Sequence, residues 1–411
     1  MKTTICIIGA GPAGLIAAIH SAFGGAQTTI VEANTAPGRK LLLTGGGRCN
    51  ITHCDSMEKL IKAFGSKGRF LSHSFYEFPP EKVLDFFAQR GLQTRVEADG
   101  CVFPITDRAT DVRDIVVDET RELGVHFVYD MRVNRIELTD SGFVVEGERE
   151  HIHAEKMIIA TGGASWPQTG SRGDGYSFAQ QLGHTIIPPR PSLVPLVTVE
   201  AWPSELAGTS LDNVTISTRI NAHKVKVSGP MIFTQDGIGG PAVLNFSTFL
   251  TDSLPAEELP IAISIDLVPA TAEPELKNQF LDLLAANPKK SVANILTAFV
   301  PRRLAVVLCA QVGCSDDCLA SQLKKEIRKN LLHMLKSLPL SIRDTRPIVE
   351  ATVTRGGVDT SQIDRLTMQS KLRPGLFFAG EVIDVDGPCG GYNLQVCWST
   401  GALAGGCAAK P

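Results

Sequence analysis

The chain has 411 residues, which is longer than one hydrophobic core usually fills, so we expect more than one domain. Hydrophobic residues make up 43% and charged residues 20% of the chain, a composition that excludes an extensively disordered protein. The formal net charge of −3 excludes a protein that binds nucleic acid through its overall positive charge.

The first residues, MKTTICIIGAG, run directly into a predicted strand without a charged leader segment. No apolar run approaches the roughly 20 residues that a membrane-spanning helix needs. The ten cysteines form neither a dense framework nor a Cys-x-x-Cys pair. We therefore expect a cytoplasmic protein with free, mostly buried thiols and no metal site.

The N-terminal part of the chain has the pattern of a βαβ unit. An apolar run at residues 3–8 predicts a buried strand, an alanine-rich stretch from residue 12 to about residue 22 predicts a helix, and residues 28–33 predict a second strand. Residues 94–105 then predict a hairpin whose turn lies at residues 99–100.

A proline-rich crossing at residues 188–196 leads into a segment of different character. Alternating apolar residues, then a helical pattern, occupy this segment, and apolar strands with glycine-rich turns return after Pro347. We therefore predict an α/β fold with one discontinuous, Rossmann-like domain and an insert. The expected parts are the discontinuous domain at 1–195 and 345–411, a β subdomain at 196–270 and a helical subdomain at 271–344.

A dinucleotide-binding fingerprint lies between the first predicted strand and helix. Gly9, Gly11 and Gly14 form G-x-G-x-x-G, whose glycines permit a tight turn, close approach to a pyrophosphate and close helix packing. The intervening Pro12 and Ala13 open the helix whose positive end faces the phosphates. Glu32, at the end of the second strand, can bind ribose hydroxyls and would repel a 2′-phosphate.

The long loop after the second strand, NTAPGRKLLLTGGGRCNITH, favours FAD over NAD at this fingerprint, because an NAD domain usually continues with further β and α units. Arg39 and Lys40 either neutralise the diphosphate or are solvated surface charges. The glycines of the loop, including Gly46 and Gly47, let bare backbone approach a flat ring. The side chains that follow them, Arg48 and Asn50, are expected contacts of the cofactor or the substrate.

Four motifs resemble the BaiN/RdsA family of FAD-dependent oxidoreductases: PGRKLLLTGGGRCNIT, ATGGASWPQTGSRGDGY, TRGGV and FFAGEVIDVDGPCGGYNLQ. The resemblance covers essentially the whole chain. It implies FAD at the fingerprint, Glu32 on the adenosine ribose, a backbone contact from Val133 to adenine, and an insert made of a small β-barrel and a helical unit. Further cofactor contacts that it implies are Ala160, Thr161, Gly162, Gly380, Glu381, Gly391, Asn393, Leu394 and Gln395.

Known members of that family imply the reduction of a C=C bond, either in a uridine of ribosomal RNA, giving dihydrouridine, or in a small steroid-like enone. Both reactions need NAD(P)H to reload the flavin. No second strand–GxGxxG–helix unit occurs, so NAD(P)H would visit the site transiently. A different class of function also remains open, an RNA- or ribosome-binding assembly factor in which FAD is only structural.

The charge is unevenly distributed along the chain. Residues 289–346 contain eleven basic and four acidic residues, a net charge of +7, which leaves −10 for the rest of the chain. A basic insert on an acidic body favours contact with ribosomal RNA over a purely small-molecule enzyme. The alternative is an ordinary solvated helix face.

The reaction also needs a proton donor. Cys49 is the candidate catalytic residue, because Arg48 beside it can lower the pKa of a thiol. The alternative is a small buried residue. Cys389 is a further candidate, whereas His53 and Tyr392 are expected to form local hydrogen bonds.

Overall fold

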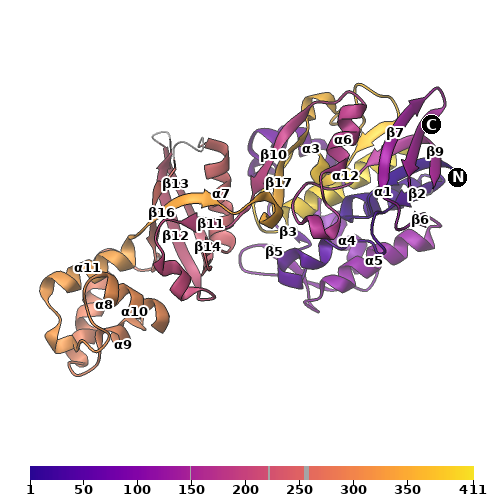
Figure 1. Ribbon diagram of the computed structural model, residues 1–411. Coiled ribbons are helices and arrows are strands. Elements are labelled where there is room, and N and C mark those ends of the chain that lie inside the picture. The colour runs from indigo at the N-terminus through magenta and orange to yellow at the C-terminus, as the bar shows by residue number, and fades with distance from the viewer. Residues whose placement is uncertain (149, 221–222, 254–258) are drawn as a thin grey trace. The chain divides into compact units, whose positions relative to one another are not determined.

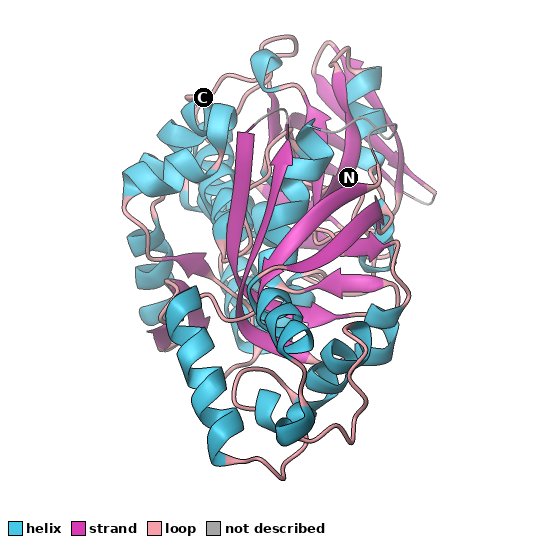
Figure 2. Ribbon diagram, turned by 90° about the vertical axis from the view of Figure 1, so that its left-hand side faces the viewer, coloured by secondary structure: helices cyan, strands magenta, loops and turns pink. Residues whose placement is uncertain are grey.

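The computed structural model describes residues 1–148, 150–220, 223–253 and 259–411. The chain divides into two compact units (Figure 1): unit 1 comprises Met1–Pro191 and Ile348–Pro411, and unit 2 comprises Ser192–Pro347. Helices and strands occur in both units (Figure 2). The predicted α/β class, with a discontinuous domain and an insert, is confirmed.

Unit 1 contains the elements at both ends of the sequence. Its strands are β1 (Lys2–Ile8), β2 (Thr28–Val31), β3 (Thr52–His53), β4 (Thr94–Val96), β5 (Cys101–Pro104), β6 (His126–Val128), β7 (Val133–Thr139), β8 (Gly142–Gly147), β9 (His151–Ile159), β10 (Ile186–Ser192), β17 (Val353–Val358) and β18 (Leu376–Phe378). Its helices are α1 (Pro12–Phe23), α2 (Met57–Ala63), α3 (Gly68–Glu77), α4 (Pro80–Ala88), α5 (Ala109–Glu122), α6 (Asp174–Gln181) and α12 (Tyr392–Ala408).

The main sheet of unit 1 has the order β6-β2-β1-β9-β8-β7, and β18 also pairs with β9. The pairs β6–β2, β2–β1, β1–β9 and β9–β18 are parallel, whereas β7 and β8 are antiparallel additions. The parallel strands are apolar because both faces of such a sheet are covered. Their carboxyl ends meet at one edge, where ligands of open α/β sheets bind.

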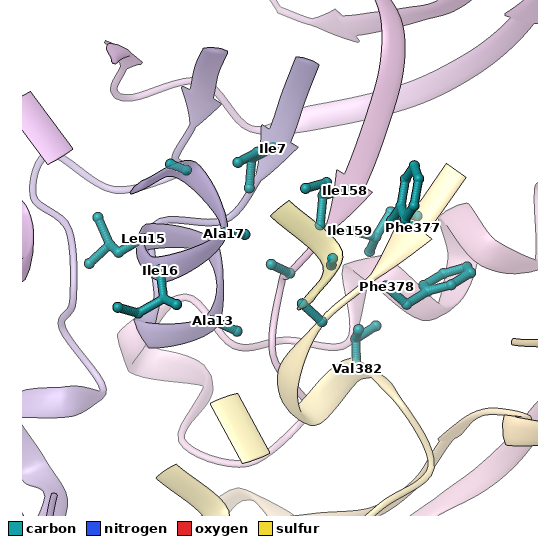
Figure 3. Packing of buried hydrophobic residues seen from close by; sticks show 14 of the residues in the cluster. Ile7, Ala13, Leu15, Ile16, Ala17, Ile158, Ile159, Phe377, Phe378 and Val382 are labelled. Carbon is teal, nitrogen blue, oxygen red and sulfur yellow. The ribbon is translucent and has the colours of Figure 1, made fainter. Parts of the chain in front are cut away.

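Helices α1 and α12 pack closely against one another and cover the sheet. Added Cβ atoms at Gly401 and Gly405 of α12 would lie 2.5 and 2.1 Å from the backbone oxygens of Ala13 and Ala17 of α1. The small residues of α12 therefore set how closely the helices approach. Figure 3 shows the buried side chains of α1 beside those of β1, β9 and β18.

Unit 2 has a core of its own. A closed barrel forms in the order β11 (Leu196–Thr198), β14 (Gly237–Gly239), β13 (His223–Phe233), β12 (Ser210–Ile220), β15 (Ile261–Asp266) and β16 (Leu338–Thr345). The helices of this unit are α7 (Pro241–Ser253), α8 (Glu273–Ala286), α9 (Val292–Leu296), α10 (Arg302–Gln311) and α11 (Lys325–Lys336). One hydrophobic cluster joins side chains of the barrel and of these helices.

Two features of unit 2 differ from the sequence-based expectation. Residues 338–344, which were assigned to the helical subdomain, lie in β16 and complete the barrel by pairing with β11 and β15. Helix α7 lies within the segment 196–270, which was expected to contain β structure. The barrel therefore takes strands from both sides of the helices α8–α11.

None of the helices in the described ranges combines the length and the apolar character that a bilayer span requires. All ten cysteines are free thiols, as predicted.

Candidate functional site

The fingerprint glycines lie where β1 turns into α1. Gly9 has φ +104°, a conformation that favours glycine, and an added Cβ would lie 2.6 Å from the backbone oxygen of Ala160. An added Cβ at Gly14 would lie 1.9 Å from the backbone oxygen of Gly9. An added Cβ at Gly11, by contrast, meets no protein atom within 4 Å. Gly11 therefore leaves open space at the N-terminus of α1.

The N-terminus of α1 makes this space suitable for an anion. Pro12 occupies the first turn, and Leu15 is the residue whose N–H bonds to the carbonyl of Gly11. The earlier N–H groups of the turn have no partner within a helix and carry the positive end of the helix dipole. A pyrophosphate fits this combination of open space and positive potential.

Glu32 follows β2 and points back to the fingerprint. Its Oε2 accepts a hydrogen bond of 2.8 Å from the N–H of Ala10, and its Oε1 accepts from the N–H of Asn34 at 2.9 Å. The N–H of Met131 donates to the carbonyl of Glu32, which brings the segment before Val133 to the same strand end. The structure thus places Glu32 beside Met131, two residues before Val133, the other residue expected at the adenosine.

Two further turns meet α1 at the carboxyl edge of the sheet. Ala160, Thr161 and Gly162 follow β9, beside Gly9. Gly380 follows β18, where an added Cβ would lie 2.7 Å from the Cβ of Ala13. Residues from three distant parts of the sequence therefore surround the first turn of α1.

Lys40 has a different partner from the expected diphosphate. Its Nζ lies 2.7 Å from Oε2 of Glu381 and donates to Oγ of Ser165 at the same distance. The other carboxylate oxygen of Glu381 accepts from the N–H of Thr354 at 2.7 Å. Because Glu381 already balances its charge, Lys40 connects protein segments in this structure. Arg39 donates to Oδ1 of Asn34 at 2.9 Å.

The glycine-rich loop forms the irregular segment η1 (Leu41–Gly47). Gly45, Gly46 and Gly47 have φ values of +57°, +68° and +90°. An added Cβ at Gly45 would lie 2.9 Å from the backbone nitrogen of Asn50, whereas Gly46 and Gly47 face open space. The latter two positions therefore permit close approach of a ligand to the backbone, as the sequence predicts.

Arg48 has partners within the protein, so its expected contact with the cofactor or the substrate is not supported. Its guanidinium donates to Oε1 of Glu97 at 2.7 Å and lies 3.8 Å from the ring centroid of Phe103, both in the β4–β5 hairpin region. The prediction that Arg48 lowers the pKa of Cys49 is wrong. Cys49 is fully buried, and burial raises the pKa of its thiol to about 12. A buried core thiol is the reading that the structure supports.

Asn50 lies at the other end of the site, beside the start of α12. Its Oδ1 is buried and has no hydrogen-bond partner within the described residues. An added Cβ at Gly391 would lie 2.8 Å from this oxygen. A buried acceptor without a partner is costly, so this oxygen can serve a donor group of a ligand.

Residues at the start of α12 have different surroundings, and some of them are buried in the protein interior. Gly391 precedes the helix with φ +91°, and the side chain of Asn393 holds the preceding loop by accepting from the N–H of Gly387 and donating to its carbonyl. Leu394 is partly buried. Gln395 is fully buried and bonds to Thr52, Phe78 and Ser399, so its expected contact with the cofactor is not supported.

A cluster of proton-carrying side chains adjoins this helix start. Tyr392 donates to Oδ2 of Asp55 at 2.6 Å, and the ring of His53 stacks on that of Tyr392 with centroids 4.6 Å apart. His53 Nδ1 lies 3.5 Å from the same carboxylate oxygen, and its Nε2 bonds to the carbonyl of Asp99. Burial, followed by the hydrogen bond to Asp55, raises the pKa of Tyr392. The expected local hydrogen bonds of His53 and Tyr392 are confirmed.

Sequence reasoning missed Asn34 and Asp55. Asn34 bridges Glu32, Arg39 and the carbonyl of Thr169, and its position just after a predicted strand end is a signal that could have identified it. Asp55 has no such signal, because its importance comes from contact with Tyr392, which lies far away in the sequence. Cys389, the remaining candidate acid, has its pKa raised by burial and then by Asp99.

Two proteins of known name are similar to this chain over nearly its whole length. A 3-dehydro-bile acid delta(4,6)-reductase of Clostridium scindens is 32% identical over 408 residues, covering 99% of each chain. A ribosomal RNA dihydrouridine synthase of Escherichia coli is 32% identical over 396 residues, covering 96% of this chain and 95% of that protein.

Solved flavoprotein structures share the fold. A flavocytochrome c3 fumarate reductase aligns with 99% of this chain and 78% of its own, at a TM-score of 0.52 and 16% identity. A 3-ketosteroid-delta4-(5alpha)-dehydrogenase of Rhodococcus jostii aligns with 100% and 97%, at a TM-score of 0.51 and 17% identity. The HI0933-like protein Rossmann domain family matches residues 3–407. The chain therefore belongs to this family of FAD-binding oxidoreductases, which its four motifs resemble.

Proposed function

We propose that the protein is an NAD(P)H-driven flavoenzyme that reduces a C=C bond, and that its substrate is a uridine of ribosomal RNA, which becomes dihydrouridine. The names of the Clostridium scindens and Escherichia coli relatives support a reduction of this kind. The observation that carries the choice of RNA is the net charge of +7 in residues 289–346 on a chain whose total is −3.

Reduction of a C=C bond adds a hydride to one carbon and a proton to the other. When bound, FAD would supply the hydride after reduction by NAD(P)H. The chain contributes the open space at Gly11, the ribose-binding carboxylate of Glu32 and the bare backbone at Gly46 and Gly47. The positive N-terminus of α12 would stabilise negative charge that develops near it.

Tyr392, Asp55 and His53 are the groups that we propose for proton supply in place of Cys49. Asp55 accepts a hydrogen bond from Tyr392, and its Oδ2 lies 3.5 Å from Nδ1 of His53, so the three side chains form one cluster around the Tyr392 hydroxyl that would deliver the proton. Tyr392→Phe should lower turnover about a hundredfold while FAD stays bound. Tyr76→Phe, at an exposed tyrosine of α3, is the matched control. A Tyr392→Phe enzyme with unchanged turnover and an unchanged pH–rate profile would remove this assignment.

Two experiments test the proposed reaction. Anaerobic mixing of the FAD-loaded protein with NADPH or NADH should bleach the flavin absorbance, whereas a protein with purely structural FAD would stay yellow. Deletion of the gene, followed by mapping of dihydrouridine in 23S ribosomal RNA, should show the loss of the modification at a defined site. If every site keeps its dihydrouridine, the RNA assignment fails.

The second candidate is reduction of a small enone, which the Clostridium scindens relative favours because it covers 99% of the chain. In that case the purified enzyme would oxidise NAD(P)H with a 3-oxo-Δ4 steroid and would leave ribosomal RNA unchanged. Comparing the two substrates under the same conditions decides between the candidates.

A further inference from the structure

Ten of the eleven basic residues of the segment 289–346 fall into two groups, and the eleventh, Arg343, lies in β16. The first group is used within unit 2: Arg302 pairs with Asp316, Arg303 donates to the carbonyls of Glu205 and Ala207, Lys336 pairs with Asp266, and Arg346 pairs with Asp236. The second group forms no ion pair within the described residues and comprises Lys289, Lys290, Lys324, Lys325, Arg328 and Lys329. Contacts within unit 2 therefore explain the first group of basic residues but not the second.

Backbone hydrogen bonds bring the second group together. The N–H of Ala320 donates to the carbonyl of Lys290, and the N–H of Ser321 donates to that of Pro288, each at 3.0 Å. The lysines after α8 therefore lie beside the segment that leads into α11. Within residues 281–290 and 320–329 the acidic side chains are Asp282 and Glu326, against six basic ones. The two segments together therefore carry a net charge of +4.

A cavity of about 520 Å³ opens in the same region. Its apolar lining includes Leu281, Leu284 and Leu323, and its polar lining includes Asp282 and Arg328. A mixture of an apolar wall and a few polar groups is typical of sites for small molecules. Of the six unpaired basic residues only Arg328 lines the cavity, and the five lysines neighbour its lining in sequence. We call the cavity together with these six residues the basic groove.

We propose that the basic groove binds single-stranded RNA, with one base in the cavity and the flanking phosphates on the lysines. This inference rests on the proposed function. Lysines attract phosphates without regard to sequence, while a guanidinium plane such as that of Arg328 can stack on a base. The carboxylate of Asp282 can accept a hydrogen bond from a base edge. An acidic peptide without aromatic residues would use the lysines but has no flat ring to fill the cavity.

The test measures equilibrium binding of a fluorescein-labelled, single-stranded oligouridylate to the full-length, FAD-loaded protein at several salt concentrations. Replacing Lys324 and Lys325 together by Ala should weaken binding at least tenfold. It should also reduce the slope of log K against log salt by about 1.4, since each lost phosphate contact contributes about 0.7. Replacing Lys224 and Lys226 of β13, which are exposed, removes the same charge from the barrel and should leave the slope unchanged.

Arg328→Lys tests the base contact, because it keeps the charge but loses the planar group. We expect at least a fivefold loss of affinity for oligouridylate and no loss for inorganic polyphosphate. Equal losses for both probes, or displacement of the RNA by polyglutamate at matched charge, would overturn the base site. Groove variants that bind oligouridylate like the wild type would overturn the groove itself.

These binding results are independent of turnover. If the groove binds RNA but gene deletion leaves every dihydrouridine in place, the proposed reaction fails and the groove stands. If the deletion removes a dihydrouridine but the groove variants bind normally, the groove fails and the reaction stands.

Discussion

Gly11 and Gly14 belong to one sequence motif but face different surroundings. Gly14 is required by the protein itself, because an added Cβ would lie 1.9 Å from the backbone oxygen of Gly9. Gly11 has ordinary backbone angles and open space, so nothing in the described chain requires a glycine there. We therefore propose that Gly11 serves the ligand rather than the fold.

Alanine substitution should separate these two roles. Gly11→Ala should leave the free energy of unfolding of the flavin-free protein unchanged and weaken FAD binding at least tenfold. Gly14→Ala should lower the free energy of unfolding by roughly 2–4 kcal/mol, because backbone has to move. Urea unfolding and flavin fluorescence titration measure the two quantities. Normal FAD affinity in Gly11→Ala would contradict the assigned pyrophosphate position.

Cys49 is a second residue whose role the structure redefines. Cys49→Ala should lower the free energy of unfolding by about 1 kcal/mol, since it removes a fully buried sulfur, and should leave turnover unchanged. Cys54→Ala, at an exposed thiol, is the control and should change neither quantity. A large loss of turnover in Cys49→Ala with FAD still bound would restore the thiol as a participant in the reaction.

At the scale of elements, α1 contains a histidine that should make the protein sensitive to acid. Burial, with a smaller effect from Lys82, lowers the pKa of His20 to about 4 from 6.5. Between these pH values the unfolded chain binds more protons than the folded one, so the free energy of unfolding falls as the pH falls. The decrease in the free energy of unfolding reaches about 3 kcal/mol and is complete near pH 4.

Substitution of this histidine tests the argument. His20→Leu should flatten the pH dependence of the free energy of unfolding between pH 6.5 and pH 4, because the titrating group is lost. His153→Gln, at an exposed histidine of β9, should keep the wild-type dependence. The measurement is urea unfolding at a series of pH values. An identical pH dependence of the free energy of unfolding for His20→Leu and the wild type would contradict the assigned role of His20.

Elements with a local pattern were predictable from the sequence. The apolar run of β1, the glycine spacing before α1 and the acid at the end of β2 lie within about thirty residues, so the nucleotide-binding turn follows from them. Strand β16 was missed, because it directly follows an amphipathic helix and is defined by pairing with β11 and β15. The contacts of Lys40 and Arg48 were also not predictable from the sequence, because their partners Glu381 and Glu97 are distant in the chain.

For the whole molecule, the separate cores of the two units predict separate folding. The excised segment Ser192–Pro347 should unfold in one cooperative thermal transition and should not bind FAD, because its hydrophobic cluster is complete and the fingerprint lies in unit 1. Circular dichroism and flavin titration check these expectations. A gradual, non-cooperative transition would show that unit 2 depends on unit 1.

The closure of the barrel by β16 also orders events during synthesis. Helices α8–α11 leave the ribosome before β16, the strand that closes the barrel. These helices can therefore pack against one another while the barrel is still open. Strand β18 and helix α12, which complete the sheet and one end of the candidate site, come later still. A nascent chain therefore acquires its basic groove before it can hold a cofactor.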